Sequence, residues 1–334
     1  MSAPRLVIAT RTTAFERVLA RHGTIGQARF FLQQREQSLD DLQRRHEEQE
    51  AAVAFVDNTA PRHWRRARVR REEFDRFLFQ PDDVVVAVGQ DGLVANLAKY
   101  LDGQPVVGVN PSPDWFDGIL TPNPAAAAPD LVRQAAAGRA PIEARTMIAA
   151  RLDDGQELLA LNEIFVGHCT HQSARYRIEL ARTSERQSSS GVIVASGTGS
   201  TGWARSVHGS RRSRLDLPAP TDRALAFFVR EAFPSKATGT TIQEGTLHDD
   251  DRLRLASEMD EGGCVFGDGI ESDRLGFPYG TRLEISCAGR VLRLVGTASA
   301  GPSGARTVAV DATVASVRSH VDAAPHRVRH SPPP

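Results

Sequence analysis

The segment from residue 83 to residue 100 constrains the fold of this chain more than any other. An apolar, β-branched run (residues 83–88) breaks at a Gly-Gln-Asp-Gly turn, and residues 93–100 then follow with helical spacing. The pattern predicts a buried strand that enters a tight turn at a helix N-terminus. Backbone N–H groups and the positive end of a helix dipole meet at such a turn, which suits phosphate. Asp91, the acid at its apex, would face the ligand, although many parallel-sheet crossovers carry a similar turn that binds nothing.

The first third of the chain alternates between strand and helix patterns. Strands are predicted over residues 6–10, 67–69, 83–88 and 105–110. Helices are predicted over 14–22, 70–75 and 93–100, and residues 26–50, extended through 52–56, are expected to form a helical pair. Alternation of this kind predicts a mostly parallel, doubly wound sheet. We therefore expect an α/β domain over residues 1–125.

After residue 125 the pattern changes to short strands separated by turns. These are predicted over residues 144–151, 157–166, 176–180, 191–195, 253–255, 282–287 and 291–295, while residues 225–230 fit either a helix or a strand. Such spacing predicts an antiparallel, sandwich-like β domain over residues 126–300. Residues 301–322 are expected to return to the first domain, and residues 323–334, rich in Pro, His and Arg, to be disordered.

Composition excludes several classes of function. The 334 residues include 41 basic and 41 acidic side chains, which gives no general nucleic-acid or membrane signature. The arginine-rich stretch 65–71 runs into acids and predicts a solvated face. No apolar run is long enough to span a bilayer, and no apolar signal segment precedes the first strand. We therefore expect a cytoplasmic protein with neither a nucleic-acid nor a membrane partner.

Cysteine and histidine give no metal or disulfide pattern. The 3 cysteines are widely scattered and cannot form a disulfide framework or a CxxC site. His168 and His171 flank Cys169, but a metal there would need a fourth ligand that the sequence does not identify. The protein by itself is expected to supply no metal site.

Four short segments, in order, resemble the NAD kinase family. They are Gly89-Gln90-Asp91-Gly92, Val107-Gly108-Val109-Asn110-Pro111, Leu161-Asn162-Glu163-Ile164, and Ser196-Gly197-Thr198-Gly199-Ser200-Thr201-Gly202-Trp203. They are similar to the family's GGDGT-type turn, GIN-type strand end, Asn-Glu pair and TPTGSTAY-type loop. The sequence resembles most the mitochondrial-type branch of the family, because further segments such as Arg11-Thr12-Thr13 and Ser189-Ser190-Gly191 are similar to that branch. The resemblance extends from about residue 5 to residue 300.

The resemblance implies a two-domain NAD kinase-like fold and a phosphotransferase that makes NADP from NAD and ATP, with Mg²⁺ carried by the triphosphate. Asp91 would accept the proton of the adenosine ribose 2′-hydroxyl in a cleft where it meets Asn162 and Glu163, whose donor and acceptor atoms suit vicinal hydroxyls. The family also forms dimers or larger assemblies, which implies a homo-oligomer here. The residues expected to bind the dinucleotide are Gly92, Asn162, Glu163, Thr198, Thr201, Gly202, Trp203 and Ser206. A phosphate cradle is expected at Gly89, Gln90 and Gly92, and Asn110 and Asp268 are lesser candidates.

Two positions depart from the family's turn. Gln90 replaces the second glycine, where a side chain would hinder the φ > 0 conformations of a phosphate cradle. Leu93 replaces a threonine and removes a hydroxyl from the helix start. These departures favour the alternative of a catalytically silent NAD(H)-binding sensor or partner subunit. A lipid or sugar kinase of the wider superfamily is a third alternative, because it would share the Asp91 turn.

Overall fold

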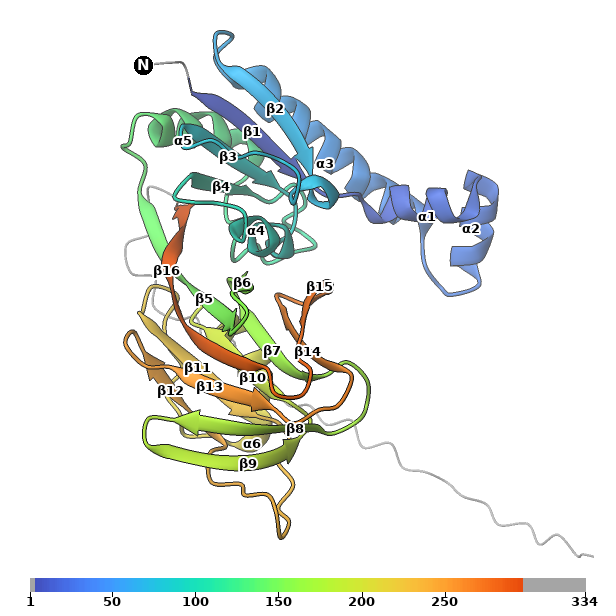
Figure 1. Ribbon diagram of the computed structural model, residues 1–334. Helices are drawn as coiled ribbons and strands as arrows, with labels where there is room; N and C mark the ends of the chain where they lie inside the picture. The colour runs from blue at the N-terminus through green and yellow to red at the C-terminus, as the bar shows by residue number, and fades with distance from the viewer. Residues whose placement is uncertain (1–3, 297–334) are drawn as a thin grey trace, which may run out of the picture. The chain divides into compact units, whose positions relative to one another are not determined.

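The computed structural model describes residues 4–296 of the chain (Figure 1). The first strands are β1 (Arg5–Thr10), β2 (Arg65–Arg70), β3 (Asp83–Val88) and β4 (Pro105–Val109). They form a parallel sheet in the order β2-β1-β3-β4. The helices are α1 (Ala14–His22), α2 (Ile25–Gln33), α3 (Leu39–Thr59), α4 (Asp91–Ala98) and α5 (Ala128–Ala136), with short 3₁₀ turns η1 (Arg71–Glu73) and η2 (Ala125–Ala127).

Helices cover both faces of this parallel sheet. Alternate strand side chains such as Ile8 and Val86 pack with α3 and α5 on one face. Their neighbours in the strands, such as Val7 and Val85, pack with α4 on the other. All six residues of β3 are buried, which explains its unbroken apolar sequence. The doubly wound arrangement predicted from the alternating pattern is confirmed.

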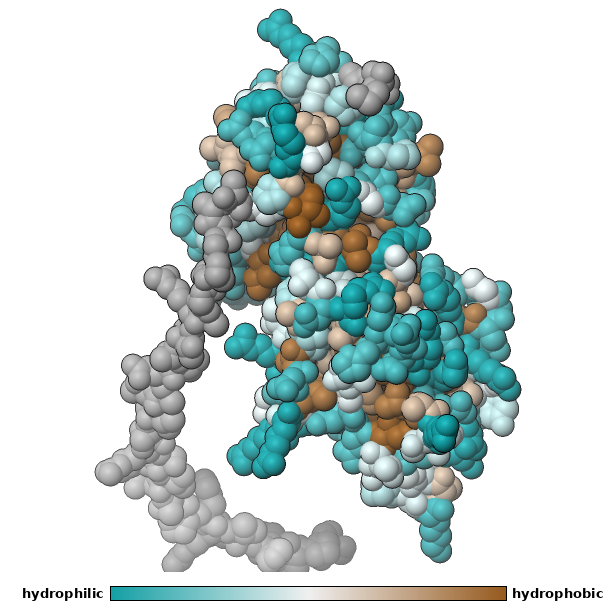
Figure 2. All heavy atoms as spheres, turned by 90° about the vertical axis from the view of Figure 1, so that its left-hand side faces the viewer, coloured by the Kyte–Doolittle hydropathy of each residue, from teal (hydrophilic) through white to brown (hydrophobic). Residues whose placement is uncertain are grey.

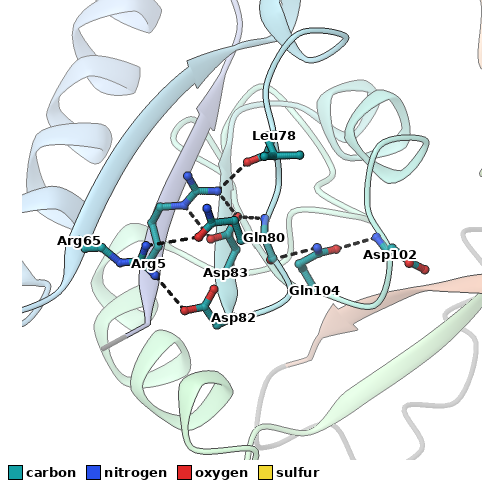
Figure 3. Close-up of polar contacts among 8 residues, drawn as sticks. All are labelled: Arg5, Arg65, Leu78, Gln80, Asp82, Asp83, Asp102 and Gln104. Atoms are coloured by element: carbon teal, nitrogen blue, oxygen red, sulfur yellow. Dashed lines mark hydrogen bonds and ion pairs between the residues drawn. The ribbon is translucent and has the colours of Figure 1, made fainter. Parts of the chain in front are cut away.

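An ion pair fixes the register of β1 against β3 at the amino edge of the sheet. Arg5 and Asp83 are direct partners in the ladder, and the guanidinium binds the carboxylate through two contacts of 2.7 and 2.6 Å (Figure 3). Asp83 also accepts the Gln80 backbone N–H at 2.8 Å. Because this network lies at the amino ends of the strands, we assign it to stability.

The second half of the chain forms two packed β layers. The strands are β5 (Ile142–Leu152), β6 (Glu157–Ala160), β7 (Glu163–His168), β8 (Ala174–Leu180), β9 (Thr183–Ser189), β10 (Val192–Ser196), β11 (Ala224–Val229), β12 (Glu244–His248), β13 (Leu253–Ser257), β14 (Gly263–Gly267), β15 (Ile270–Gly276) and β16 (Arg282–Val295). One layer has the order β12-β11-β10-β7-β14-β15, and β16-β13-β8-β9 with β5 and β6 form the other. Side chains from both layers, such as Ile148 and Val194, share one core. The 3₁₀ turn η3 (Gly199–Thr201) and helix α6 (Trp203–Arg211) follow β10.

Strand β16 connects the two halves. Arg293 and Leu294, near its end, pair in parallel with β4. On its other edge β16 pairs antiparallel with β5 along most of its length, and residues 282–285 pair antiparallel with β13. The parallel strands and one β layer therefore form a single ten-stranded sheet. The two strands predicted over 282–287 and 291–295 are in fact this one strand. A register shift between Cys287 and Val291 interrupts its pairing at the position of the predicted gap.

Other predictions of elements were wrong in detail. The single strand predicted over 157–166 is two strands, β6 and β7, separated at Leu161 and Asn162. The ambiguous segment 225–230 is strand β11. Strands β9, β12, β14 and β15 were missed, because their polar and glycine-rich sequences lack a clear alternation. The expected return segment 301–322 and tail 323–334 lie outside the described residues, and the domain boundaries stay predictions.

The surface has no single extended apolar face in the view of Figure 2, where hydrophobic residues form separate patches in a mainly hydrophilic surface. Among the helices of the described residues, none combines the length and the apolar character that a membrane span requires. All three cysteines are free thiols, with Cys264 and Cys287 buried and Cys169 exposed.

Candidate functional site

The break between β6 and β7 is stabilised by a carboxylate that is distant in the sequence. Asp268 lies in the hairpin turn between β14 and β15 and accepts hydrogen bonds from three consecutive backbone N–H groups. The distances are 3.0 Å to Leu161, 2.7 Å to Asn162 and 3.4 Å to Glu163. In return, the Asp268 N–H donates to the Glu163 carbonyl at 3.0 Å. The Asn162-Glu163 pair is therefore fixed in a bend where a continuous strand was predicted.

Burial changes the acidity of this cluster. Burial raises the pKa of Glu163 to about 7, and the nearby Asp268 carboxylate adds to the rise. Burial also raises the pKa of Asp268, while the N–H groups of residues 161–163 and the ammonium of Lys99 oppose that shift. Lys99, from α4, donates to the Gly267 carbonyl at 3.2 Å and lies 3.5 Å from Asp273. Helix α4 is thereby attached to the same hairpin that holds Asn162.

The glycine-rich loop after β10 packs directly on Asn162. The Ser196 N–H donates to the Asn162 carbonyl at 2.9 Å, and the Ser196 hydroxyl donates to the Leu161 carbonyl at 2.5 Å. A Cβ atom at Gly199 would lie 2.0 Å from the Asn162 carbonyl oxygen, so only glycine permits this approach. Thr198, in the same loop, is also buried. The structure thus brings together the Asn-Glu pair, Asp268 and the loop, three features far apart in the sequence.

The remaining loop residues lie at the start of α6. The Thr201 hydroxyl donates to the Thr198 carbonyl at 2.9 Å, and the Ser206 N–H donates to the Gly202 carbonyl at 3.2 Å. Thr201, Gly202 and Ser206 are exposed.

Trp203 forms one wall of a pocket of about 310 Å³. Its ring is stacked on Phe165 with centroids 6.0 Å apart, and the Arg230 guanidinium lies 5.6 Å from its centroid. An aromatic wall of this kind suits a planar ring of a ligand.

Asp91 is the first residue of α4, and its carboxylate is engaged by the loop that follows β4. It accepts the backbone N–H groups of Ile119 at 3.0 Å, Leu120 at 2.8 Å and Thr121 at 3.2 Å, with the Thr121 hydroxyl at 3.3 Å. Both oxygens therefore already have donors. The expected meeting of Asp91 with Asn162 and Glu163 in a cleft stays a prediction.

The two departures at the α4 turn have structural explanations. Gln90 has φ −91°, so the expected conflict between its side chain and a φ > 0 backbone does not occur. Gly89, at φ +155°, is the residue with the unusual conformation, and a Cβ there would lie 3.2 Å from Leu93 Cδ2. Leu93 is fully buried in the apolar cluster beneath α4. It serves packing, and the exposed Gly92 is the residue of this turn that faces solvent.

Asn110 shapes the loop after β4. Its amide donates to the Phe116 carbonyl at 2.8 Å, and its side-chain oxygen accepts the Ser112 N–H at 3.0 Å. Both ends of the side chain are thus engaged within the loop, and a role of Asn110 in binding stays a prediction.

Two residues that the sequence did not single out belong to the site. One is Lys99, whose ammonium donates to the Gly267 carbonyl in the β14–β15 hairpin. Arg145, on β5, is 6% exposed; its Nη1 lies 3.5 Å from the Thr198 hydroxyl and its Nη2 lies 3.2 Å from Glu143. Its buried Nε has no partner within residues 4–296. Its position directly before the buried run 146–150 of β5 was the signal that could have identified it.

The described part of the chain holds no group of three or more His, Cys, Asp or Glu side chains arranged to bind a metal ion.

Comparison with known proteins gives local sequence similarity and a shared fold. No family model matches the sequence. Three NAD kinases are similar in part: that of Chlorobaculum tepidum is 25% identical over 55% of this chain and 62% of its own length. Those of Methylococcus capsulatus and Burkholderia thailandensis are 34% and 32% identical, each over 38% of this chain and over 46% and 44% of their lengths. The similarity thus spans less than two thirds of each relative.

Among solved structures, yeast NADH kinase in complex with NADH superimposes with a TM-score of 0.57. The match covers 89% of this chain and 84% of that one at 14% sequence identity. The predicted fold class is confirmed, and the chain has the fold of a NADH kinase, with an α/β domain followed by a β-rich domain.

Proposed function

We propose that this protein is a NAD kinase-like phosphotransferase that transfers the γ-phosphate of ATP to the adenosine ribose 2′-hydroxyl of NAD. The observation that carries the proposal is the convergence of Asn162 and Glu163, the Gly199 loop and Asp268. The sequence resemblance assigns these segments to dinucleotide binding, and tertiary contacts hold them at one point. The partial similarity to three NAD kinases supports the same assignment.

In this proposal Asn162 and Glu163 bind the vicinal hydroxyls of the ribose. The Asn162 amide offers a donor and an acceptor, and the Glu163 carboxylate accepts when ionised. Because the pKa of Glu163 is about 7, its charge changes near neutral pH and affinity should depend on pH there. Trp203 supplies a stacking surface for a ring of the dinucleotide.

Asp91 is proposed as the general base. It would accept the proton of the 2′-hydroxyl as that oxygen attacks the γ-phosphorus and the β–γ bridging bond breaks, with the electron pair leaving on ADP. Mg²⁺ would enter with the triphosphate and neutralise its charge. The Asp91 Oδ2 accepts one N–H group, that of Ile119, and therefore keeps an acceptor position for the substrate hydroxyl.

A NAD(H)-binding sensor is the second candidate, and one observation favours it. Both oxygens of Asp91 accept hydrogen bonds from residues 119–121, so the carboxylate stabilises the conformation of this loop. If these hydrogen bonds hold the carboxylate away from the 2′-hydroxyl when the dinucleotide is bound, the protein would bind it without turnover.

The test is NADP formation by purified protein with ATP, Mg²⁺ and NAD, with the melting temperature measured in parallel. Turnover supports the kinase. No turnover with a NAD-dependent rise in melting temperature supports the sensor. If NAD gives neither turnover nor a higher melting temperature, but a sugar or a lipid raises the melting temperature, the assignment changes to another kinase of the superfamily. The expected homo-oligomer is part of the proposal and is tested by light scattering.

A further inference from the structure

Lys99, at the end of α4, is an unusual residue for this chain. Of the 41 lysines and arginines, Lys99 and Lys236 are the two lysines. Lys236 is exposed in the loop between β11 and β12. The Lys99 side chain is only 7% exposed. A charge buried to this degree must be compensated by neighbouring groups.

The Lys99 ammonium contacts the hairpin formed by β14 and β15. Its Nζ donates to the Gly267 carbonyl at 3.2 Å and lies 3.5 Å from the Asp273 carboxylate. The ammonium also acts on the carboxylate of Asp268, where it opposes the rise of the pKa that burial causes. One carbonyl and two carboxylates of a single hairpin therefore compensate the buried charge.

These acceptors suit an ammonium better than a guanidinium. A lysine donates in three directions from one nitrogen, whereas the donors of an arginine lie in one plane and favour two parallel bonds to a carboxylate. Here the two hydrogen-bond acceptors come from different strands, Gly267 from β14 and Asp273 from β15. The buried position also leaves little room for a larger head group. This geometry accounts for a lysine in a sequence that otherwise uses arginine.

The same hairpin fixes the Asn162-Glu163 pair. A Cβ atom at Gly267 would lie 2.9 Å from the Cβ of Ala160, so the hairpin packs directly on the last residue of β6. The next residue, Asp268, accepts the backbone N–H groups of residues 161–163. Lys99 therefore binds the residue beside the one that holds the pair in its bend.

Apolar contacts join α4 to the same region. Leu93 and Leu97 of α4 are buried in one cluster with Leu159 and Leu161 at the end of β6. Figure 1 shows α4 between the parallel sheet and these strands. Apolar burial is non-directional and does not by itself fix one position of the helix along its axis. The contacts of the ammonium with Gly267 and Asp273 are directional and supply that constraint.

The other end of α4 carries the proposed general base. The helix begins at Asp91, and Lys99 directly follows its last residue, Ala98. At 1.5 Å per residue the two side chains are attached about 12 Å apart on one short, rigid element. A shift at Lys99 is therefore transmitted to Asp91. A displacement of about 1 Å in a reacting group can cost roughly a hundredfold in rate.

We propose that Lys99 is a positioning residue: its ammonium attaches the end of α4 to the β14–β15 hairpin and thereby sets where Asp91 lies relative to Asn162 and Glu163. The inference rests on the proposed function, because it concerns the geometry between the general base and the ribose-binding pair of that reaction. Lys99 acts through other residues. Its loss should therefore lower turnover and leave dinucleotide affinity nearly unchanged.

Steady-state NADP formation and equilibrium binding of NAD, both on the full chain, test the proposal. Lys99→Met keeps the unbranched stem and removes the charge. Its kcat should fall at least tenfold, while its Kd for NAD should change less than threefold, because the hydrogen bonds from residues 161–163 to Asp268 do not involve Lys99. Lys99→Arg keeps the charge, which covers a failure of Lys99→Met to fold, and should lower kcat at least threefold with NAD affinity retained.

The matched control is Lys236→Met, the same substitution at the exposed lysine, which should leave kcat and Kd within twofold. Wild-type kcat in Lys99→Met would overturn the positioning role. Equal losses of kcat and of NAD affinity would also overturn it, because they would show that the bend of Asn162 and Glu163, and not the position of Asp91, depends on Lys99. Full kcat in Lys99→Arg would overturn the requirement for an ammonium.

Amide hydrogen exchange gives a readout that needs neither NAD nor turnover. In Lys99→Met, exchange should become at least threefold faster in the hairpin, residues 264–275, and at the end of α4, residues 95–98. Exchange in β10, residues 192–196, should stay as in wild type. Unchanged exchange in the first two segments would overturn the attachment. If wild type makes no NADP, the proposed function fails, and faster exchange in both segments would still support the attachment of α4 by Lys99.

Discussion

The Asp268 carboxylate lies 2.7 Å from the backbone nitrogen of Asn162, a residue 106 positions earlier in the chain. A single hairpin turn thus determines where β6 ends and β7 begins. The same carboxylate accepts the N–H groups of Leu161 and Glu163, so the bend that presents the Asn-Glu pair depends on one side chain.

Replacing this carboxylate should destabilise the protein. Asp268→Ala leaves three backbone N–H groups without their acceptor, and we expect a loss of about 2–4 kcal/mol in unfolding free energy. Urea denaturation measures it. Asp260→Asn is the control, because the Asp260 side chain is 83% exposed and its ion pair with Arg175 is long, at 4.0 Å. A loss below about 0.5 kcal/mol in Asp268→Ala would show that the turn does not hold the bend.

The partly buried Glu163 should make stability depend on pH. Its pKa is raised to about 7 in the folded protein from an ordinary value of 4.5. The folded state therefore binds more protons than the unfolded state between these values, and stability falls as pH rises through that window. Glu163→Gln removes the penalty, so its gain over wild type should be about 2–3 kcal/mol larger at pH 8 than at pH 5. Urea midpoints at the two pH values test this; a gain that is equal at both would contradict the raised pKa.

The glycine-rich loop lies so close to Asn162 that adding one methyl group at Gly199 tests its role in NAD binding. Gly199→Ala would place a Cβ 2.0 Å from the Asn162 carbonyl oxygen, so the loop must move away from the pair. We expect loss of the NAD-dependent rise in melting temperature. Gly209→Ala is the matched control, because its Cβ meets nothing within 4 Å and a helical alanine is favoured. Retained NAD binding in Gly199→Ala would remove this loop from the site.

The parallel half was predictable because its signals are local. Strand β3 and the helix that follows are encoded by a continuous apolar run, a turn and a helical period within residues 83–100, and the structure reproduces them. The yeast NADH kinase superposition confirms the fold class that the ordered motifs implied.

The site was harder to predict because its decisive contacts are long-range. Asp268 carried little weight, since a hairpin turn alone explains an Asp-Gly pair. The apolar run 157–166 looked continuous because the hydrogen bonds that divide it come from residue 268. The donors around Asp91 lie 28 to 30 positions away in an irregular loop, where periodicity gives no information.

Leu93 should resist conversion to the related family's threonine. The side chain is fully buried and a Cβ at Gly89 would lie 3.2 Å from its Cδ2, so Leu93→Thr creates a cavity and buries a hydroxyl. We expect a loss of about 2–4 kcal/mol. Thermal denaturation decides, with Leu78→Thr, at a position 76% exposed, as the control; equal effects of the two substitutions would refute the packing role.

Substitution of Asp91 can distinguish a catalytic role of its carboxylate from a structural one. Asp91→Asn keeps the shape but turns an NH₂ group toward backbone donors of residues 119–121, so we expect about 1–3 kcal/mol of destabilisation. In the kinase proposal it also abolishes NADP formation while NAD binding persists. Asp41→Asn is the control, since Asp41 is likewise an acid in the first turn of a helix, α3. If Asp91→Asn were as stable as the control and still inactive, the carboxylate would serve catalysis and would not be needed to stabilise the loop. If it were destabilised yet retained full turnover, the base assignment would be wrong and the loop contact would be its whole role.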